Sequence, residues 1–498
     1  MKHFLIFMFL AAQATGTVQG DTRWRIRCNF PAPKGILEHY YVGDSWDFFG
    51  RSRFSLKKLD LVVFTDKSGG EEWGDVTAGG INLRDFPGKS GNVAAGWLRA
   101  RLGPGTVFSA GDKLTDPSEF TMYKPPATGN RIRPASSSRT CREEPLTGAG
   151  CVIGLGNVEF ALLAAYSRLD SIGGGYHRTA SQVDARGTVG ELLGVTRVSV
   201  DRAGLALTTG RRNGTGTEEW TRCGLDWSVP VASFGLSGEL SLGMDSGGTS
   251  ASFWNSISYR GNSFRSSFIL LRNPENFPRQ RSSSPISRTC DLGAVIAARW
   301  GTASRGVLEM GCGVYFEKDD DMICGTGSFS RRLAEGLEGS LGMKARIGNE
   351  ESVGRGWARI TWRPHSMISV REKTRFTHWK TSEPDSTETG SGVEIRVSLK
   401  PWTTTGIDMG GAACSTDGYN SRIYAGNCRF PGEFGATALY GKMLLLFCGL
   451  TVKTSEYLTL RLCVSRHTAE GVSSMGTGWE ETLGNSRTKT GFQLDYEF

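Results

Sequence analysis

Apolar and polar residues alternate strictly along much of this chain, which is the pattern of β-strands with one apolar and one polar face. One such segment ends at the final residue, and its apolar positions are Phe492, Leu494, Tyr496 and Phe498. The same period recurs over residues 234–244, 393–400 and 458–465. Segments of about 10 residues are long for soluble sheets and suit strands that cross a bilayer at a tilt.

The connections between these segments alternate between short and long. Short connections are expected at residues 260–262, 334–336, 363–366, 401–404 and 453–456. Longer and more polar connections are expected at residues 170–190, 272–289, 381–391, 414–433 and 467–486. The two sets fall at opposite ends of the strand array, as in outer-membrane barrels with short periplasmic turns and long extracellular loops.

The sequence therefore predicts an all-β fold, a large antiparallel transmembrane β-barrel. Counting back to residues 24–30 gives about 20–24 strands, and the number must be even because both termini lie on the periplasmic side. A set of soluble β-sandwiches would also give many short strands. However, no linker rich in Pro and Ser divides this chain into units of ~100–150 residues.

The final aromatic residue, with apolar residues at alternate positions before it, resembles the signal by which the barrel assembly machinery recognises outer-membrane proteins. The resemblance implies that Phe492, Leu494, Tyr496 and Phe498 form an assembly signal. It also implies that the chain lies in the outer membrane of a Gram-negative bacterium.

A basic start, an apolar run and a small-x-small cleavage site at residues 12–14 give residues 1–20 the layout of a secretory signal peptide. We expect the mature chain to begin near Thr15 or Asp21, and residues 21–498 to form one barrel domain. No later stretch approaches the ~18 consecutive apolar residues of a transmembrane helix.

Glycine supplies 67 of the 498 residues, and the apolar residues without it make up 38%. A barrel accounts for this low apolar total, because only every second strand residue faces lipid while the others face water. Glycine then serves turns, bulges and curved strands. The formal net charge of +8 is a mild excess that suits an anionic surface or solute and excludes a dense nucleic-acid-binding tail.

The chain carries several short motifs, namely Tyr41-Val42-Gly43 with Arg53 and Asp66–Glu71, the run Gly96–Gly105, Gly175–Thr179 with Glu191 and Gly194, and Gly238-Glu239 with Ser258–Arg260. Together they resemble the outer-membrane β-barrel module of bacterial competence-related helix-hairpin-helix proteins. The resemblance runs across most of the mature chain and implies a large barrel, with DNA uptake or envelope assembly as an alternative function. Because only the barrel is recognisable, we expect no direct nucleic-acid binding without a partner protein.

The glycines of the second motif, Gly96, Gly103 and Gly105, are interpreted as sites of tight bends and close strand approach. Gly43-Asp44-Ser45 resembles the nucleophile block of Gly-Asp-Ser esterases, but the Asp-x-x-His that would supply its base does not occur in the sequence. We interpret it as a polar turn. We expect no catalytic residue, no cofactor and no metal, and a membrane-embedded hydrolase is the weakest alternative.

Two groups of basic residues could narrow the lumen or an outer loop. His177 and Arg178 lie in a Gly-rich loop, where they could form a constriction for anionic solutes or tie the loop to the wall by hydrogen bonds. Arg131 and Arg133 belong to a basic cluster in the long segment 111–147, where they could bind lipopolysaccharide phosphates or line an anion pathway.

The 11 cysteines are many for an exported barrel. Cys448 and Cys463 are expected to stand opposite each other across a short turn, and Cys414 and Cys428 share one outer loop. The sequence therefore predicts the disulfides Cys448–Cys463 and Cys414–Cys428 in the oxidising envelope.

These features favour a porin-like or transport-associated channel. An envelope or DNA-uptake component that acts with a partner is the alternative. The expected partners are outer-membrane lipid and lipopolysaccharide, the barrel assembly machinery and small solutes.

Overall fold

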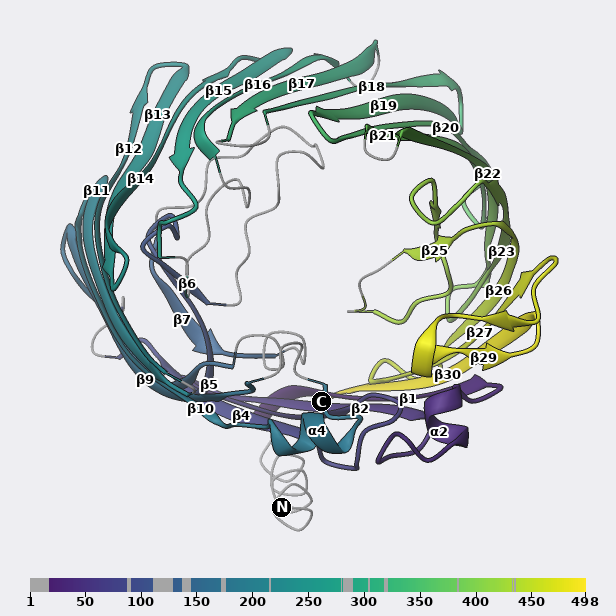
Figure 1. The fold of residues 1–498 in the computed structure, drawn as a ribbon, viewed down its shortest axis with the longest axis horizontal. Helices are drawn as coiled ribbons and strands as arrows, with labels where there is room; N and C mark the ends of the chain where they lie inside the picture. Colours follow the sequence, from purple (N-terminus) through teal and green to yellow (C-terminus); the bar gives the residue numbers. More distant parts are fainter. Residues whose placement is uncertain are drawn as a thin grey trace.

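The computed structural model describes residues 18–86, 91–110, 129–136, 145–171, 176–214, 216–278, 280, 290–302, 305–317, 321–382, 385–431, 433 and 436–498. These residues form a closed antiparallel barrel with a wall of 24 strands, viewed end-on in Figure 1. The wall closes because β1 (Val18–Phe30) pairs with β2 (Trp46–Leu56) on one side and with β30 (Ser486–Glu497) on the other. The all-β fold, the even strand number and the upper end of the expected range are confirmed.

The other wall strands follow one another in chain order. The first eleven are β3 Leu59–Lys67, β4 Val76–Arg84, β5 Asn92–Leu102, β8 Thr147–Leu155, β9 Val158–Leu169, β10 Val189–Val200, β11 Ala203–Asn213, β12 Thr217–Val231, β13 Phe234–Asp245, β14 Gly248–Arg260 and β15 Phe264–Asn273. The remaining ten are β16 Cys290–Thr302, β17 Gly306–Phe316, β18 Met322–Ala334, β19 Leu337–Gly348, β20 Glu351–His365, β21 Ile368–Ser382, β22 Asp385–Trp402, β23 Thr405–Thr416, β26 Lys442–Lys453 and β27 Leu458–Ala469.

Alternation along the strands separates an outer apolar face from an inner face. In β13, Leu240 and Leu242 are exposed on the outside, whereas the alternate residues Glu239 and Ser241 are buried on the inside. Exposed aromatic residues gather near the short turns. They are Phe234, Phe264, Trp300, Trp362, Trp402 and Tyr457. An apolar band ended by a ring of aromatic residues is how a membrane-spanning β-barrel meets lipid and the interface, so this chain is a transmembrane barrel of the outer-membrane type.

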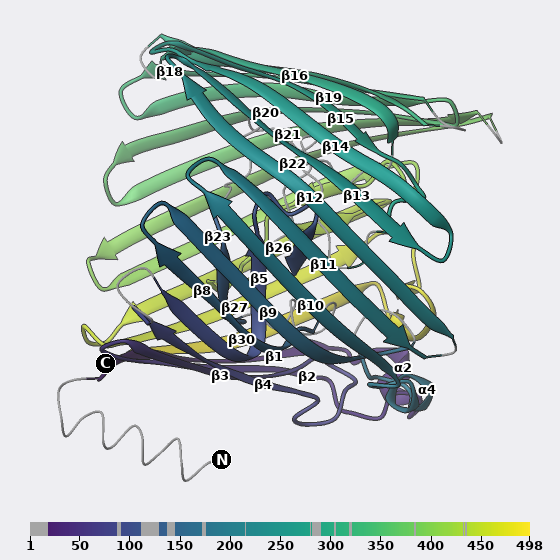
Figure 2. The same cartoon turned by 90° about the vertical axis from the view of Figure 1, so that its left-hand side faces the viewer.

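The short turns and both ends of the wall lie at one end of the barrel. Figure 2 shows the C-terminus at that end and two short helices, α2 (Lys34–Leu37) and α4 (Ala180–Asp184), at the other. In the described residues, no helix is long and apolar enough to cross a membrane.

One expected long loop is wrong. The connection predicted over residues 381–391 does not exist, because β21 extends to Ser382 and β22 already begins at Asp385. Residues 385–392 contain no large apolar side chain. The alternation signal is therefore missing from a stretch whose hydrogen bonds still continue the sheet.

Two segments fold into the ring of strands, as Figure 1 shows. The first insert comprises the second half of β5 with β6 (Phe108–Ala110) and β7 (Arg131–Pro134), both of which pair with β5. The second insert, residues 417–441, contains the hairpin of β24 (Ile423–Ala425) and β25 (Thr437–Leu439). Both inserts pack apolar side chains against the inner wall, so the inside of this barrel is polar only in part.

Candidate functional site

The first insert begins where β5 leaves the wall. β5 pairs with the wall strand β8 as far as Trp97 and pairs with β7 from Leu98 onward. Gly96 has φ +104°, and a Cβ there would lie 2.4 Å from the backbone oxygen of Gly79. This close approach confirms the bend that the glycine was expected to permit.

A buried carboxylate in the wall anchors the far end of the first insert. Glu239 of β13 accepts hydrogen bonds from the backbone N–H groups of Thr106 and Val107, at 3.2 and 3.0 Å. Burying an ionised carboxylate is costly unless such donors satisfy it. These two hydrogen bonds to Glu239 therefore fix the far end of the insert to one place on the wall.

A second buried contact lies at the turn of the first insert that contains Gly103. Arg197 and Asp226 of the wall form a buried ion pair at 2.8 Å, and Gly103 packs against this pair. A Cβ on Gly103 would meet Arg197 Nε at 2.9 Å and Asp226 Oδ2 at 3.0 Å, and φ there is +68°. Glycine is thus required at this turn for both space and backbone conformation.

Arg131 and Arg133 project from β7 on the exposed side of the first insert, while Ile132 between them is buried against the wall. Their alternation comes from the strand itself. The rest of that basic cluster, Arg139 and Arg142, lies outside the described residues.

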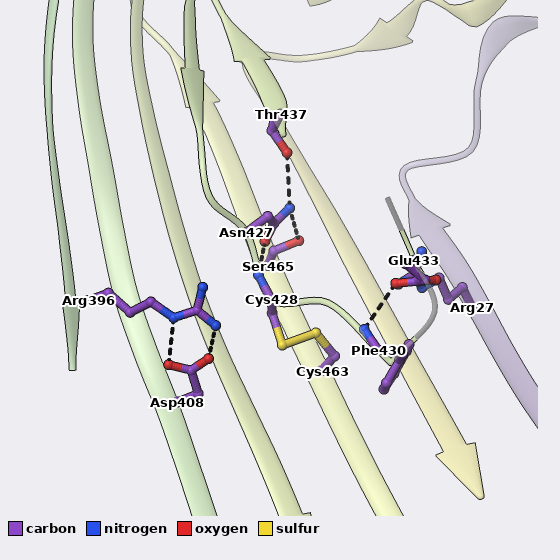
Figure 3. The surroundings of a disulfide bond; sticks show 10 residues. All are labelled: Arg27, Arg396, Asp408, Asn427, Cys428, Phe430, Glu433, Thr437, Cys463 and Ser465. Carbon is purple, nitrogen blue, oxygen red and sulfur yellow. Dashed lines mark hydrogen bonds and ion pairs between the residues drawn. A yellow bond between two sulfur atoms is a disulfide. The ribbon is translucent and has the colours of Figure 1, made fainter. Parts of the chain in front are cut away.

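The second insert is fastened to the wall by a disulfide, shown in Figure 3. The bond joins Cys428 of the insert to Cys463 of β27. Both expected pairings, Cys448–Cys463 and Cys414–Cys428, are therefore wrong, and Cys414 and Cys448 are free thiols.

The register between β26 and β27 explains why the predicted Cys448–Cys463 pairing is wrong. Cys463 stands opposite Gly449, and Cys448 stands opposite Val464. A shift of one residue sends a side chain to the other face of a strand, so Cys448 faces outward while Cys463 faces inward. Only a segment inside the barrel can reach Cys463.

Carboxylates and arginines complete the attachment of the second insert. Glu394 of β22 accepts the backbone N–H of Gly426 at 2.9 Å. Glu433 pairs with Arg25 and Arg27 of β1, as Figure 3 shows for Arg27. The insert therefore spans the inner face from β22 to β1.

The loops at the outer end are joined by a cluster that we call the rim clasp, centred on His177. Its ring lies between two carboxylates, with Nδ1 2.8 Å from Asp75 Oδ1 and Nε2 3.0 Å from Asp170 Oδ2. Its backbone N–H donates to Glu71 at 3.2 Å. Both ring nitrogens lie within hydrogen-bond distance of a carboxylate oxygen, so the ring joins Asp75 to Asp170.

Arg178 extends the rim clasp to the last outer loop. It forms an ion pair with Glu480 and lies over the rings of Tyr41 and Tyr176. The Tyr41 hydroxyl donates to Glu480 at 2.8 Å. Burial and this hydrogen bond to an anion raise the pKa of Tyr41 to about 12, so the phenol stays neutral.

Local sequence explains why this loop is ordered beside α4. Thr179 caps α4 by accepting the N–H of Gln182, and the Gln182 side chain accepts the N–H groups of Thr179 and Arg178. This reciprocal arrangement is a capping box. His177 is only 6% exposed, and the contacts of His177 and Arg178 tie the loop to its neighbours, as the second of the two alternatives describes.

Asp44 and Ser45 lie in a polar turn, as interpreted. Asp44 accepts hydrogen bonds from Lys67 Nζ at 2.6 Å and from the Trp46 N–H at 3.0 Å. Burial alone would raise the pKa of Asp44, but these bonds outweigh it and hold the pKa below its usual range. The Asp44 carboxylate therefore stabilises this turn.

Sequence reasoning missed Glu239 and the Arg197–Asp226 pair as attachment points. A signal existed, because Gly238-Glu239 and the run Gly96–Gly105 were singled out as motifs. What could not be read from one chain was that Glu239 contacts the two residues that directly follow this run, since 132 residues separate Val107 from Glu239.

No known family model matches the chain, and no curated protein sequence matches it. Solved structures do show a likeness. The anion-selective porin from Comamonas acidovorans is 11% identical over 62% of this chain and 100% of its own, with a TM-score of 0.33. The translocation pore of the P pilus usher PapC is 9% identical over 96% and 99%, with a TM-score of 0.42. The siderophore receptor PirA from Pseudomonas aeruginosa is 8% identical over 97% and 80%, with a TM-score of 0.41. Each is a likeness of barrel fold alone.

Proposed function

We propose that this chain is an outer-membrane channel of a Gram-negative bacterium whose lumen is narrowed by two inserts. One observation carries the proposal: a closed wall of 24 strands encloses more width than its own side chains can fill. The inserts occupy part of that width, and charged residues such as Arg131 and Arg371 are exposed inside. Water and small solutes have a polar path past them.

The constriction that the sequence assigned to basic residues falls on Arg131 and Arg133 in this proposal. Their exposed side chains project from the first insert. The partners that we propose are outer-membrane lipid, with lipopolysaccharide at the outer rim, and the barrel assembly machinery acting on β30. We also propose that residues 1–20 include a signal peptide that is removed.

Conductance of purified, folded protein in planar lipid bilayers tests the channel. We expect stable open-channel currents, and a larger single-channel conductance for the variant Arg131→Ala/Arg133→Ala. The same protein after heat denaturation is the control. Absence of current in several lipid compositions would contradict a channel function and favour a structural or partner-dependent role for the barrel.

A second candidate function rests on the motifs shared with competence-related barrels. Tyr41, Val42, Glu71 and His177 come from two of these motifs and meet in the rim clasp. A shared, ordered outer surface suits a role in envelope assembly or DNA uptake with a partner protein. Deleting this gene and measuring DNA uptake alongside solute uptake would separate the two candidates.

A further inference from the structure

The inner face of three neighbouring strands, β19, β20 and β21, carries a continuous set of cations. We call it the basic face, and its members are Arg346, Arg355, Arg359, Arg371, Lys373 and Arg375. The alternating residues Met343, Ile360 and Phe376 are exposed on the lipid side, so the six cations point into the barrel. Arg355 lies over the ring of Tyr424, which belongs to the second insert and confirms this direction.

The basic face has few carboxylates to balance it. Among the described residues, Glu394 is the carboxylate that forms an ion pair with it, at 2.8 Å from Arg375. Arg359 donates instead to the Ser340 hydroxyl at 3.0 Å. The buried Nε atoms of Arg346 and Arg355 have no hydrogen-bond acceptor in the part of the chain that the structure describes.

The arc that closes the barrel, formed by β27, β30, β1 and β2, is organised differently. Among the described residues, seven of its inward cations have a carboxylate within ion-pair distance, and Arg487 of β30 is the exception. The pairs are Arg51 and Arg53 with Asp21, Arg23 and Arg461 with Asp495, Arg25 and Arg27 with Glu433, and Lys489 with Asp47. The unbalanced charge of the basic face is therefore not a general property of this lumen.

The strand register places like charges side by side. Arg359 stands directly opposite Lys373, and Trp357, in the next inward position of β20, lies within 5.8 Å of both cations. Like charges directly opposite each other destabilise a sheet. The set extends from Arg346, beside Val353, to Arg371, beside Thr361, which is roughly 27 Å along the strands at ~3.3 Å per residue.

We propose that the basic face is a binding strip for small oxyanions that carry several negative charges, such as phosphorylated solutes. Five of its six cations are arginines, whose planar guanidinium groups bind phosphate and carboxylate oxygens with paired hydrogen bonds. The length of the strip lets one anion pass between successive cations as it crosses the membrane. This inference deepens the proposed channel function and rests on it for the passage of the solute.

Reversal potential and block by inorganic tripolyphosphate test the strip in planar bilayers. We expect chloride to permeate more readily than potassium, and tripolyphosphate to block the current. The variant Arg355→Gln/Arg359→Gln/Lys373→Gln should lose the chloride preference and weaken the block about tenfold, since charged hydrogen bonds are removed. Arg371→Gln/Lys373→Gln, confined to one strand, is the milder second variant.

Arg53→Gln is the matched control, because it removes an inward cation that is already paired with Asp21. It should leave both readouts near the wild-type values. Open channels that prefer potassium, or a block that the triple variant does not weaken, would contradict anion binding by the basic face. Either result would leave the proposed channel function intact.

If the protein does not conduct, calorimetric titration of tripolyphosphate into detergent-solubilised barrel tests the strip alone. Binding that is lost in the triple variant and retained in Arg53→Gln would support it. Absence of binding to the wild-type protein would overturn it. Folding of each variant is checked by its heat-modifiable mobility on gels.

Discussion

The two ends of the chain meet through Gly20 and Phe498. The backbone N–H of each donates to the carbonyl of the other, at 2.8 and 3.1 Å. The Phe498 ring also packs against Phe54, with ring centroids 5.7 Å apart, and a Cβ on Gly20 would lie 2.8 Å from this ring. The last residue thus seals the closing pair of strands.

Deleting Phe498 should therefore impair assembly of the barrel. The deletion removes both backbone hydrogen bonds at the seam and a ring contact of up to about 3 kcal/mol. The measurement is the amount of heat-modifiable protein in the outer-membrane fraction. Tyr457→Ala, which truncates an exposed aromatic in a short turn, is the control. Normal assembly of the deletion variant would contradict both the seam and the assembly signal.

At the scale of elements, the disulfide Cys428–Cys463 joins a segment inside the lumen to the wall. The insert also depends on Glu394 and Glu433, but these contacts are ion pairs and hydrogen bonds that water and salt can weaken. The covalent link is the contact that keeps the insert beside β27 under all conditions in an oxidising envelope.

Breaking this link should make the channel larger or noisier. We expect Cys428→Ser/Cys463→Ser, or wild-type protein treated with a membrane-permeant reductant, to show a higher conductance with frequent transitions between levels. Cys448→Ser, which removes an outward-facing thiol, is the matched control. Unchanged single-channel currents in the double variant would show that the polar contacts alone hold the insert.

The strands could be predicted because lipid on one side and a wet or packed interior on the other impose a period of two residues. The prediction failed where that contrast is absent. Residues 385–392 continue β22 without apolar positions, and residues 18–23 extend β1 before the expected residues 24–30. A mature start near Thr15 keeps the whole of β1, whereas a start at Asp21 would remove its first three residues.

The inserts could not be predicted from the sequence. Leu98 and Leu102 of β5 alternate with polar residues as a wall strand does, although they are buried against the inner wall. Cys428 could be placed in a loop, but its partner depends on which loops turn inward, and that depends on contacts between distant strands.

At the scale of the whole molecule, the departure of β5 leaves one joint of the wall without continuous strand pairing. Among the described residues, positions 76–79 of β4 pair with β3 but not with β5. On the other side of the joint, residues 166–169 of β9 pair with β10 but not with β8. Asp75 directly precedes β4 and Asp170 directly follows β9. His177 joins these two carboxylates, so the rim clasp bridges the two edges.

His177→Ala should loosen this joint while the rest of the barrel stays folded. Removing one partner from a buried charged cluster costs about 3–5 kcal/mol, because each carboxylate loses one of its donors while Arg186 and the Gly187 N–H remain. Hydrogen exchange of residues 68–75 and 176–188 should become at least ~100-fold faster, since 1.4 kcal/mol corresponds to a factor of ten. His365→Ala, in the exposed turn after β20, is the control. Equal hydrogen-exchange protection in both variants would show that the rim clasp does not contribute to closure of the wall.

Elsewhere, separating two wall strands would break a row of backbone hydrogen bonds that lipid cannot replace. At the joint between β4 and β9, the outer half is closed by an imidazole ring and two carboxylates. Closure there depends on a few side-chain contacts, which a substitution can remove. Among the wall strands that the structure describes, this joint is therefore one that a single side-chain substitution can weaken.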